Sequence, residues 1–349
     1  MKNLEPKRLS INELGSVKRK AVSVAQEELI KMELIAQEKA LPLVVKPAVE
    51  GLDLVAWAMS NQGFVEAHLL QHGGILFRNF SVKSEADFEQ FIKAVSGEML
   101  EYRERSSPRK RVSGNIYTST EYPADQSIFL HNENSYQSSW PLKIFFFCAI
   151  PAQQGGETPI ADCRKVFERL HAKTRDRFIR KKVMYVRNFG DGFGLPWQEV
   201  FQTTDKAVVE KYCDKADIQV EWKAGNQLRT RQIRQAVARH PRTGEIVWFN
   251  HAAFFHISTL EAAIREELLA AYREEDLPNN TYYGDGSRIE PAVLDELREA
   301  YRQEIVSFPW QAGDVLMLDN MLTAHSRAPF VGPRKVLVGM SQLYSSTDI

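Results

Sequence analysis

The chain has 349 residues, of which 44% are apolar and 10% aromatic, enough to pack a large core in one or two domains. Its 45 basic and 45 acidic residues cancel, so composition gives no reason to expect a nucleic acid or a membrane surface as partner. Three cysteines without Cys-x-x-Cys spacing disfavour a disulfide framework and a structural zinc site. We expect them to be inert core side chains.

The N-terminal segment is charged and lacks the apolar run of a signal peptide. The longest apolar run, residues 144–150, is too short to cross a bilayer as a helix. These features predict a cytoplasmic protein.

A helical extension is predicted at the N-terminus. Between residues 16 and 39, apolar side chains at Val24, Leu29, Met32 and Ile35 recur among many charges, which favours a surface helix. Residues 1–40 would then precede a main domain at 41–349.

The main domain begins with helix and strand signals in alternation and continues with short strands bounded by Pro or Gly. This pattern favours an α+β fold, a jelly-roll sandwich with flanking helices. Residues 176–290 mix strands, Gly-rich loops and a helix at 259–273, and we expect this loop-rich insertion to form a lid or substrate wall. The other expected elements are helices at 61–71, 85–96 and 163–171, the last capped by Asp162, and strands at 74–80, 142–150, 314–319 and 335–343.

An imidazole and a carboxylate, those of His131 and Glu133, follow a predicted strand at 127–130. On a strand His131 and Glu133 point to one face and Asn132 to the other. An imidazole and a carboxylate so placed form the short arm of a 2-His-1-carboxylate triad, which leaves positions open on a non-haem Fe(II). His325, near the end of the 314–325 segment, supplies the second histidine.

Four motifs stand in one order along the chain: Tyr-Thr-Ser-Thr-Glu-Tyr-Pro at 117–123, His-Asn-Glu at 131–133, Gly-Gly-Glu-Thr-Pro at 155–159, and Asp-Asn…His…Gly-Pro-Arg at 319–334. Together they resemble the taurine/2,4-dichlorophenoxyacetate dioxygenase family of Fe(II)/2-oxoglutarate oxygenases. The wording at 130–136, followed by Trp-Pro-Leu-Lys at 140–143, is similar to the branch found beside nonribosomal peptide synthetases. The resemblance runs from about residue 41 to residue 343.

The resemblance implies a double-stranded β-helix of the cupin-like kind, with His131, Glu133 and His325 as ligands of Fe(II). Many family members have Asp where Glu133 stands, and the carboxylate argues against a halogenase. Thr158 and Arg334 match the family's anchors for 2-oxoglutarate, the cosubstrate used with O₂. A guanidinium suits this task, because it offers permanently charged, paired donors to a carboxylate.

Other residues have weaker claims to the site. Asn115 and Tyr117 could line a substrate pocket or be turn and core residues. Asn250 could contact cofactor or substrate, although an asparagine at a strand end more often satisfies backbone groups. His251 and His256 are expected to be core or hydrogen-bonded histidines rather than ligands. The loop Arg109-Lys110-Arg111 is expected to be solvated, or to meet an acidic partner at the mouth of the site.

The leading hypothesis is an oxygenase that hydroxylates an unactivated C–H bond, with desaturation available to the same chemistry. The resemblance points to an amino-acid substrate, either free or tethered to an acidic peptidyl carrier protein. Taurine is disfavoured, because taurine-type members carry a second arginine where this chain has Val338. The alternatives are a free small organic acid as substrate, a metal-binding jelly roll that hydrolyses or isomerises, and a silent binding module.

Overall fold

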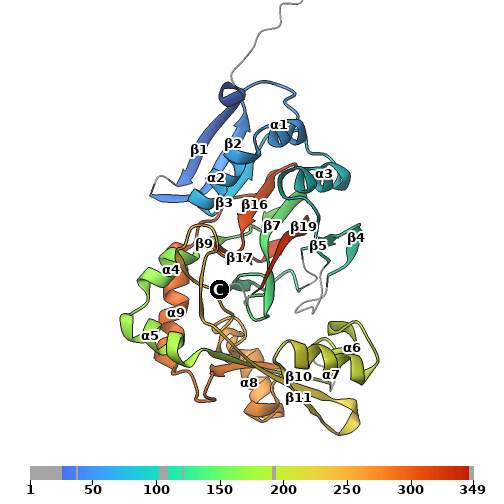
Figure 1. The fold of residues 1–349 in the computed structure, drawn as a ribbon, viewed down its shortest axis with the longest axis vertical. Helices are drawn as coiled ribbons and strands as arrows, with labels where there is room; N and C mark the ends of the chain where they lie inside the picture. Colours follow the sequence, from blue (N-terminus) through green and yellow to red (C-terminus); the bar gives the residue numbers. More distant parts are fainter. Residues whose placement is uncertain (1–25, 37, 102–108, 120–121, 191–193, 346–349) are drawn as a thin grey trace, which may run out of the picture.

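The computed structural model describes residues 26–36, 38–101, 109–119, 122–190 and 194–345 (Figure 1). Its centre is an eight-stranded sheet whose neighbours run antiparallel, apart from one parallel pair between the second and third strands. In spatial order the strands are β1 (Ile30–Ala36), β2 (Lys39–Pro47), β3 (Gly74–Phe77), β16 (Val315–Asp319), β7 (Ser139–Ile150), β19 (Lys335–Ser345), β5 (Ile116–Thr118) and β4 (Arg111–Ser113).

A smaller layer of strands packs against the middle of this sheet. It contains the three-stranded sheet β6 (Ile128–His131), β17 (Thr323–Arg327) and β9 (Ile160–Asp162), and the pair β8 (Gln154–Gly155) and β18 (Phe330–Val331). The two layers touch where the ring of Phe146 on β7 lies 5.1 Å from the ring of His325 on β17. The result is a β-sandwich with a histidine in the space between its layers.

Three helices cover the other face of the large sheet: α1 (Leu54–Ser60), α2 (Gln62–His72) and α3 (Glu85–Ser96) (Figure 1). Each has a local reason to begin or end where it does. Asp53 caps α1, a capping box at Ser84 and Asp87 begins α3, and Gly73 at φ 75° ends α2 in a conformation that favours glycine. Immediately before β1, Gln26–Leu29 forms a short 3-10 helix.

The insertion carries an antiparallel four-stranded sheet of its own, in the order β11, β12, β10, β15, at the bottom of Figure 1. Its helices and strands are α5 (Ala172–Lys181), β10 (Val183–Phe189), α6 (Trp197–Val200), α7 (Lys206–Lys215), β11 (Gln219–Trp222), β12 (Leu228–Arg234), β13 (Val237–Arg239), β14 (Ile246–Trp248), α8 (Ala262–Ala271) and β15 (Asn279–Tyr283), with 3-10 helices at Ala224–Asn226, Ile257–Thr259 and Glu274–Asp276. The helices α4 (Cys163–Arg169) and α9 (Pro291–Glu304) flank it and pack on each other.

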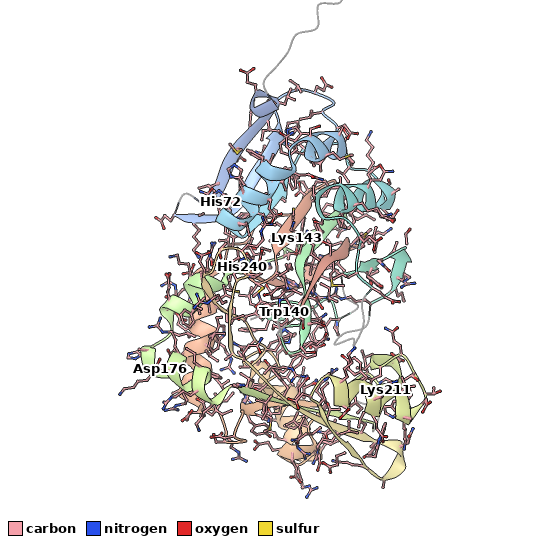
Figure 2. The ribbon with its side chains drawn as sticks, in the orientation of Figure 1. His72, Trp140, Lys143, Asp176, Lys211 and His240 are labelled. Carbon is pink, nitrogen blue, oxygen red and sulfur yellow. The ribbon has the colours of Figure 1, made fainter. Side chains whose placement is uncertain are left out.

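One buried contact ties the insertion to the large sheet. Backbone N–H groups of Arg242 and Thr243 donate to Nδ1 of His240, so the ring's proton lies on Nε2 and is donated to Asp319 over 3.0 Å. Figure 2 labels His240 together with Trp140 and Lys143, two buried residues of β7. Asp319 ends β16, so this contact joins the insertion to the strand that precedes the second predicted histidine ligand.

The predicted helices at 61–71, 85–96 and 163–171, and the strands at 142–150, 314–319 and 335–343, are confirmed within a few residues. All three cysteines are buried and form no disulfide, and burial raises the pKa of Cys148 and Cys163 to about 12. No helix in the described ranges is both long and apolar enough to span a membrane.

The predicted N-terminal helix is wrong where the structure describes it. Ile30–Ala36 is the edge strand β1, and the proposed domain boundary at residue 40 falls inside β2. Apolar and charged residues alternate in Ile-Lys-Met-Glu-Leu, as they do in a strand. Met32 and Leu34 are nevertheless exposed at the edge of the sheet, so these apolar residues do not mark a buried face. The part of this prediction at residues 1–25 lies outside the described residues. The insertion is also richer in regular structure than predicted, and helix α9 was not foreseen.

Candidate active site

Strand pairing brings the three predicted metal ligands together. His131 on β6 lies directly opposite His325 on β17, with ring centroids 4.5 Å apart. Glu133 follows β6 in a turn, and one ligand atom from each residue lies within 4.8 Å of the others. The prediction placed Glu133 on the strand itself. The strand ends at His131, yet the carboxylate still reaches the histidine face.

The donor chemistry of this cluster suits a divalent metal. His131 donates from Nδ1 to the carbonyl of Phe129 over 2.8 Å, which leaves Nε2 as a lone-pair donor. The Nδ1 atom of His325 is buried without a hydrogen-bond partner among the described residues. Burial lowers the pKa of both imidazoles, so both are neutral, as ligands must be. Two nitrogens and one carboxylate oxygen are the donor set of a facial triad for Fe(II).

Asn320 holds the turn that carries Glu133. The Glu133 N–H donates to Asn320 Oδ1 over 2.8 Å, and Asn320 Nδ2 donates to the carbonyls of Glu133 and Pro141, each over 2.9 Å. The side chain of Asn132 points away from the ligands and donates to the Asn320 carbonyl over 2.7 Å. The sequence identified Asn320 only as a member of the Asp-Asn motif. The structure shows that its side chain holds the backbone of Glu133.

Arg109 is the largest departure from the sequence-based expectation. Instead of lying in a solvated loop, its side chain is 5% exposed and donates from Nη2 to Oε2 of Glu133 over 2.7 Å. Lys110 and Arg111 are exposed, as expected for the loop. The buried carboxylate explains the difference, because a guanidinium leaves water at low cost only when it gains a charged partner.

The predicted cosubstrate anchors lie in the same space. Arg334 donates from Nε to the Gly156 carbonyl over 2.8 Å and from Nη1 to Ser119 Oγ over 3.2 Å. No described residue accepts a hydrogen bond from its Nη2. Trp310 Nε1 donates to Oγ1 of Thr158 over 3.2 Å, so the hydroxyl keeps its own proton to donate. Burial, and next the neighbouring Arg327, lowers the pKa of Arg334 to about 10, which still leaves it charged at neutral pH.

Steric crowding explains why two glycines, Gly155 and Gly156, stand in the turn beside Arg334. Gly155 and Gly156 adopt φ 66° and 74°, a conformation that L side chains rarely take. A Cβ on Gly155 would lie 2.2 Å from the Pro329 carbonyl oxygen, and one on Gly156 would lie 3.0 Å from Arg334 Cδ. The glycines therefore let the turn approach the guanidinium closely.

Two triad residues, His131 and His325, and both anchors open into one cavity of about 620 Å³. The sandwich contributes its polar wall, which includes His131, His325, Thr158 and Arg334. The insertion contributes an aromatic and aliphatic wall, and Phe254 stacks on the His131 ring at 4.6 Å with an interplanar angle of 11°. The apolar residues of that wall are Phe254, Phe255, Ile257, Leu260, Ile264 and Leu268.

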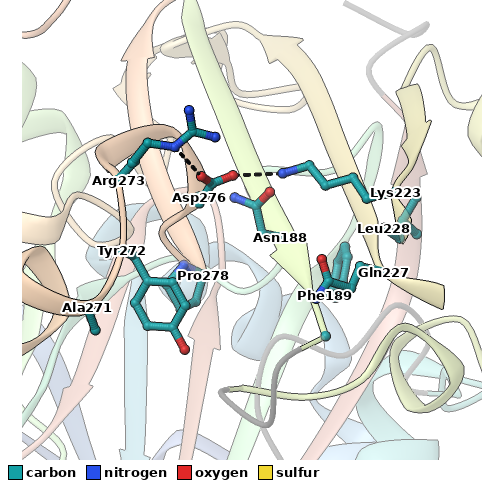
Figure 3. Close-up of a pocket in the computed structure, with 11 residues that line it drawn as sticks. Asn188, Phe189, Lys223, Gln227, Leu228, Ala271, Tyr272, Arg273, Asp276 and Pro278 are labelled. Atoms are coloured by element: carbon teal, nitrogen blue, oxygen red, sulfur yellow. Dashed lines mark hydrogen bonds and ion pairs between the residues drawn. The ribbon is translucent and has the colours of Figure 1, made fainter. Parts of the chain in front are cut away.

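A second cavity, of about 440 Å³, lies inside the insertion (Figure 3). Asp276 sits at its edge and pairs with Lys223 at 2.7 Å and with Arg273 at 3.0 Å. Because the carboxylate is satisfied by cations, we interpret this group as a structural ion-pair network. The two cavities share one wall residue, Pro278.

Comparison with known proteins agrees with this geometry. Residues 39–341 match the family described as "Taurine catabolism dioxygenase TauD, TfdA family". The chain belongs to that family. It is accordingly a non-haem iron dioxygenase that uses 2-oxoglutarate and O₂, as the motifs indicated.

Two curated relatives cover most of this TauD/TfdA-family chain. The dapdiamide synthesis protein DdaC of Enterobacter agglomerans is 43% identical over 81% of this chain and 87% of its own. A clavaminate synthase-like protein of Arabidopsis thaliana is 28% identical over 87% of this chain and 94% of its own. The crystal structure of PvcB from Pseudomonas aeruginosa has a TM-score of 0.54 at 13% identity, covering 91% of this chain and 92% of PvcB. That likeness confirms the predicted jelly-roll fold.

The three weaker candidates lie away from the cavity of this dioxygenase. Asn115 donates to the Met99 carbonyl over 3.0 Å, and the Tyr117 ring is fully buried in the core between the layers. Asn250 donates to the Ala236 carbonyl over 2.6 Å and accepts from the N–H of Ala252. None of them is among the described residues that line the cavity, and their contacts agree with the alternative roles in a turn, in the core and in satisfying backbone groups.

The two additional histidines differ from each other. His251 is buried, and its Nε2 contacts the Asn132 carbonyl at 2.8 Å, as expected of a core histidine. His256 lines the cavity and shares a 2.7 Å hydrogen bond with Ser258. Sequence reasoning had no signal for Phe254 or His256 at the site, because their approach depends on how the insertion packs.

Proposed function

We propose that this dioxygenase hydroxylates an unactivated C–H bond of an amino-acid-type substrate in specialised metabolism, with the substrate carried on a peptidyl carrier protein. The observation that carries the proposal is the division of the central cavity. Its arginines, including Arg327 and Arg334, lie on the sandwich side, and the insertion contributes a wall that is mostly apolar but includes His256 and Glu267. A volume of about 620 Å³ falls in the range of pockets for drug-sized ligands, so it accommodates more than the cosubstrate alone.

His131, Glu133 and His325 would hold Fe(II), which supplies the oxidising chemistry when it is bound with 2-oxoglutarate and O₂. Arg334 and Thr158 would hold the distal carboxylate of 2-oxoglutarate by a charge-assisted pair and a hydroxyl donor. The wall around Phe254 would exclude water and orient the C–H bond, which makes the insertion a substrate wall and lid.

Two observations support an amino-acid derivative rather than taurine. Val338 is an apolar side chain fully buried in the core, so this position offers no cation to a sulfonate. The relative at 43% identity is named for dapdiamide synthesis, a biosynthetic role. The basic-loop argument for an acidic carrier is weaker than the sequence suggested, because Arg109 is buried and only Lys110 and Arg111 remain exposed.

The free amino acid is the second candidate, favoured by Glu267 on the cavity wall, a carboxylate that could meet a substrate ammonium group. The deciding experiment compares succinate formation for a panel of amino acids, each supplied free and loaded on a carrier protein. We expect carrier-loaded substrate to give at least tenfold higher kcat/KM. Equal turnover would remove the carrier, and oxidation of taurine alone would overturn the proposal.

A further inference from the structure

Arg109 and Glu133 form a buried ion pair directly beside the metal ligands. Their side chains are 5% and 2% exposed, and Nη2 of Arg109 lies 2.7 Å from Oε2 of Glu133. Arg109 lines the central cavity together with His131 and His325. The guanidinium therefore contacts one ligand and borders the same cavity as the other two.

The second carboxylate oxygen of Glu133 could occupy a metal position that the cosubstrate or O₂ needs. A glutamate carries one more methylene than the aspartate common in this family, which gives the carboxylate more reach and one more rotatable bond. Carboxylates bind metal ions through one or both oxygens. A facial triad works because three positions stay open, two for the cosubstrate and one for O₂. A glutamate bound through both oxygens would occupy one of them.

We propose that Arg109 is a positioning residue that holds Oε2 of Glu133 and so makes this glutamate a one-oxygen ligand. The pair leaves Oε1 as the oxygen available to the metal. A cation so close to a divalent ion is otherwise unfavourable, and here the shared carboxylate and the dianionic cosubstrate offset the repulsion. Arginine suits the role because its planar donors fix the orientation of a carboxylate, which a lysine ammonium does less well.

The inference rests on the triad of the proposed function, but its test needs no substrate. Full-length protein would be loaded with Co(II) without O₂, and the visible spectrum and the affinity for 2-oxoglutarate measured. In R109M we expect Co(II) to bind still, with a changed d–d spectrum, and 2-oxoglutarate to bind at least about tenfold more weakly, the lower end of the effect of losing a residue that orients a metal ligand. R111Q is the matched control, since Arg111 is exposed and pairs with Glu101 on the surface.

The double variant E133D/R109M separates positioning from a structural role. The shorter aspartate reaches less far around the metal, so it should recover most of the 2-oxoglutarate affinity lost in R109M. An unchanged spectrum and affinity in R109M would overturn the proposal. So would loss of Co(II) binding in R109M and the double variant alike, which would make Arg109 structural. Normal 2-oxoglutarate binding with a raised KM for substrate would instead make Arg109 a substrate contact and also overturn it.

Discussion

The two walls of the active-site cavity are built by different means. The sandwich wall is fixed by backbone pairing: His131 and His325 are register partners, and Asn320 binds the backbone on both sides of the Glu133 turn. The insertion wall is fixed by side-chain packing, with Phe254 resting on the His131 ring through an aromatic stack. Hydrogen-bonded register positions a ligand tightly, whereas an apolar wall can be repacked. We therefore expect the chemistry to depend on the rigid wall and substrate choice on the adaptable one.

Breaking the rigid wall at a ligand should have the largest effect. We expect His131→Ala or His325→Ala to abolish succinate formation and to lower Fe(II) affinity by more than the 10- to 100-fold typical of an outer-shell change. The fold should persist, as judged by circular dichroism and the unfolding midpoint. Full activity in either variant would show that the metal lies elsewhere.

Arg334→Ala tests the same wall one step from the metal. Loss of a charge-assisted pair whose buried partner stays charged costs about 2–5 kcal/mol. At about 1.4 kcal/mol per decade, 2-oxoglutarate affinity should fall at least tenfold, with little change in substrate affinity. Isothermal titration without O₂ measures both. If 2-oxoglutarate binds Arg334→Ala normally, the cosubstrate is anchored elsewhere.

Asn320→Ala sharpens the comparison, because it touches neither metal nor cosubstrate. It leaves the N–H of Glu133 and two carbonyls without their partner, and an unsatisfied buried group costs about 1–3 kcal/mol. We expect a lower unfolding midpoint and about 10- to 100-fold weaker Fe(II) binding. Normal metal affinity in a destabilised variant would mean that the turn is held by other contacts.

Phe254→Ala tests the adaptable wall. We expect the Phe254 ring to pack on the substrate as well as on His131. An aromatic contact contributes about 0.5–1.5 kcal/mol beyond its buried area, so the substrate KM should rise by about two- to tenfold. Affinity for 2-oxoglutarate should stay as it is, and the ratio of succinate to oxidised product should increase. An equal loss of cosubstrate and substrate binding would contradict the division between the walls.

The remaining prediction concerns the pH dependence of stability and not activity. Burial, and next Arg298, lowers the pKa of His256 to about 4, against about 6.5 in the unfolded chain. The unfolded state thus binds the proton more readily, so this contribution to stability is complete above pH 6.5 and is lost as pH falls toward 4. Between pH 7.5 and pH 5 we expect the wild type to lose roughly 2 kcal/mol more than His256→Gln, measured by denaturant unfolding. Parallel losses would assign the pH dependence to other groups.

How much the sequence could predict follows the same division. Local signals were sufficient for α3, with its capping box and apolar face, and for the apolar strand β7. The grouping of His131, Glu133 and His325, and the place of Arg334 in the same cavity wall as the two histidines, were predictable because the family's motifs contain these residues. Arg109 was misinterpreted, because its partner lies 24 residues away and no local pattern reports burial of a charge. β1 was misassigned because an exposed edge strand lacks a clear apolar face.

The pairing of β6 with β17 also sets the moment at which the metal centre can exist. The contact between Asn132 and Asn320 spans 188 residues of chain, and His325 lies beyond it. At about 5–20 residues per second, a ribosome needs about 10–40 seconds to add that stretch. A nascent chain therefore carries His131 and Glu133 without the second imidazole until synthesis has passed His325. Iron loading through the proposed triad would require a chain that extends beyond β17, and a product truncated before this strand would be left without the centre.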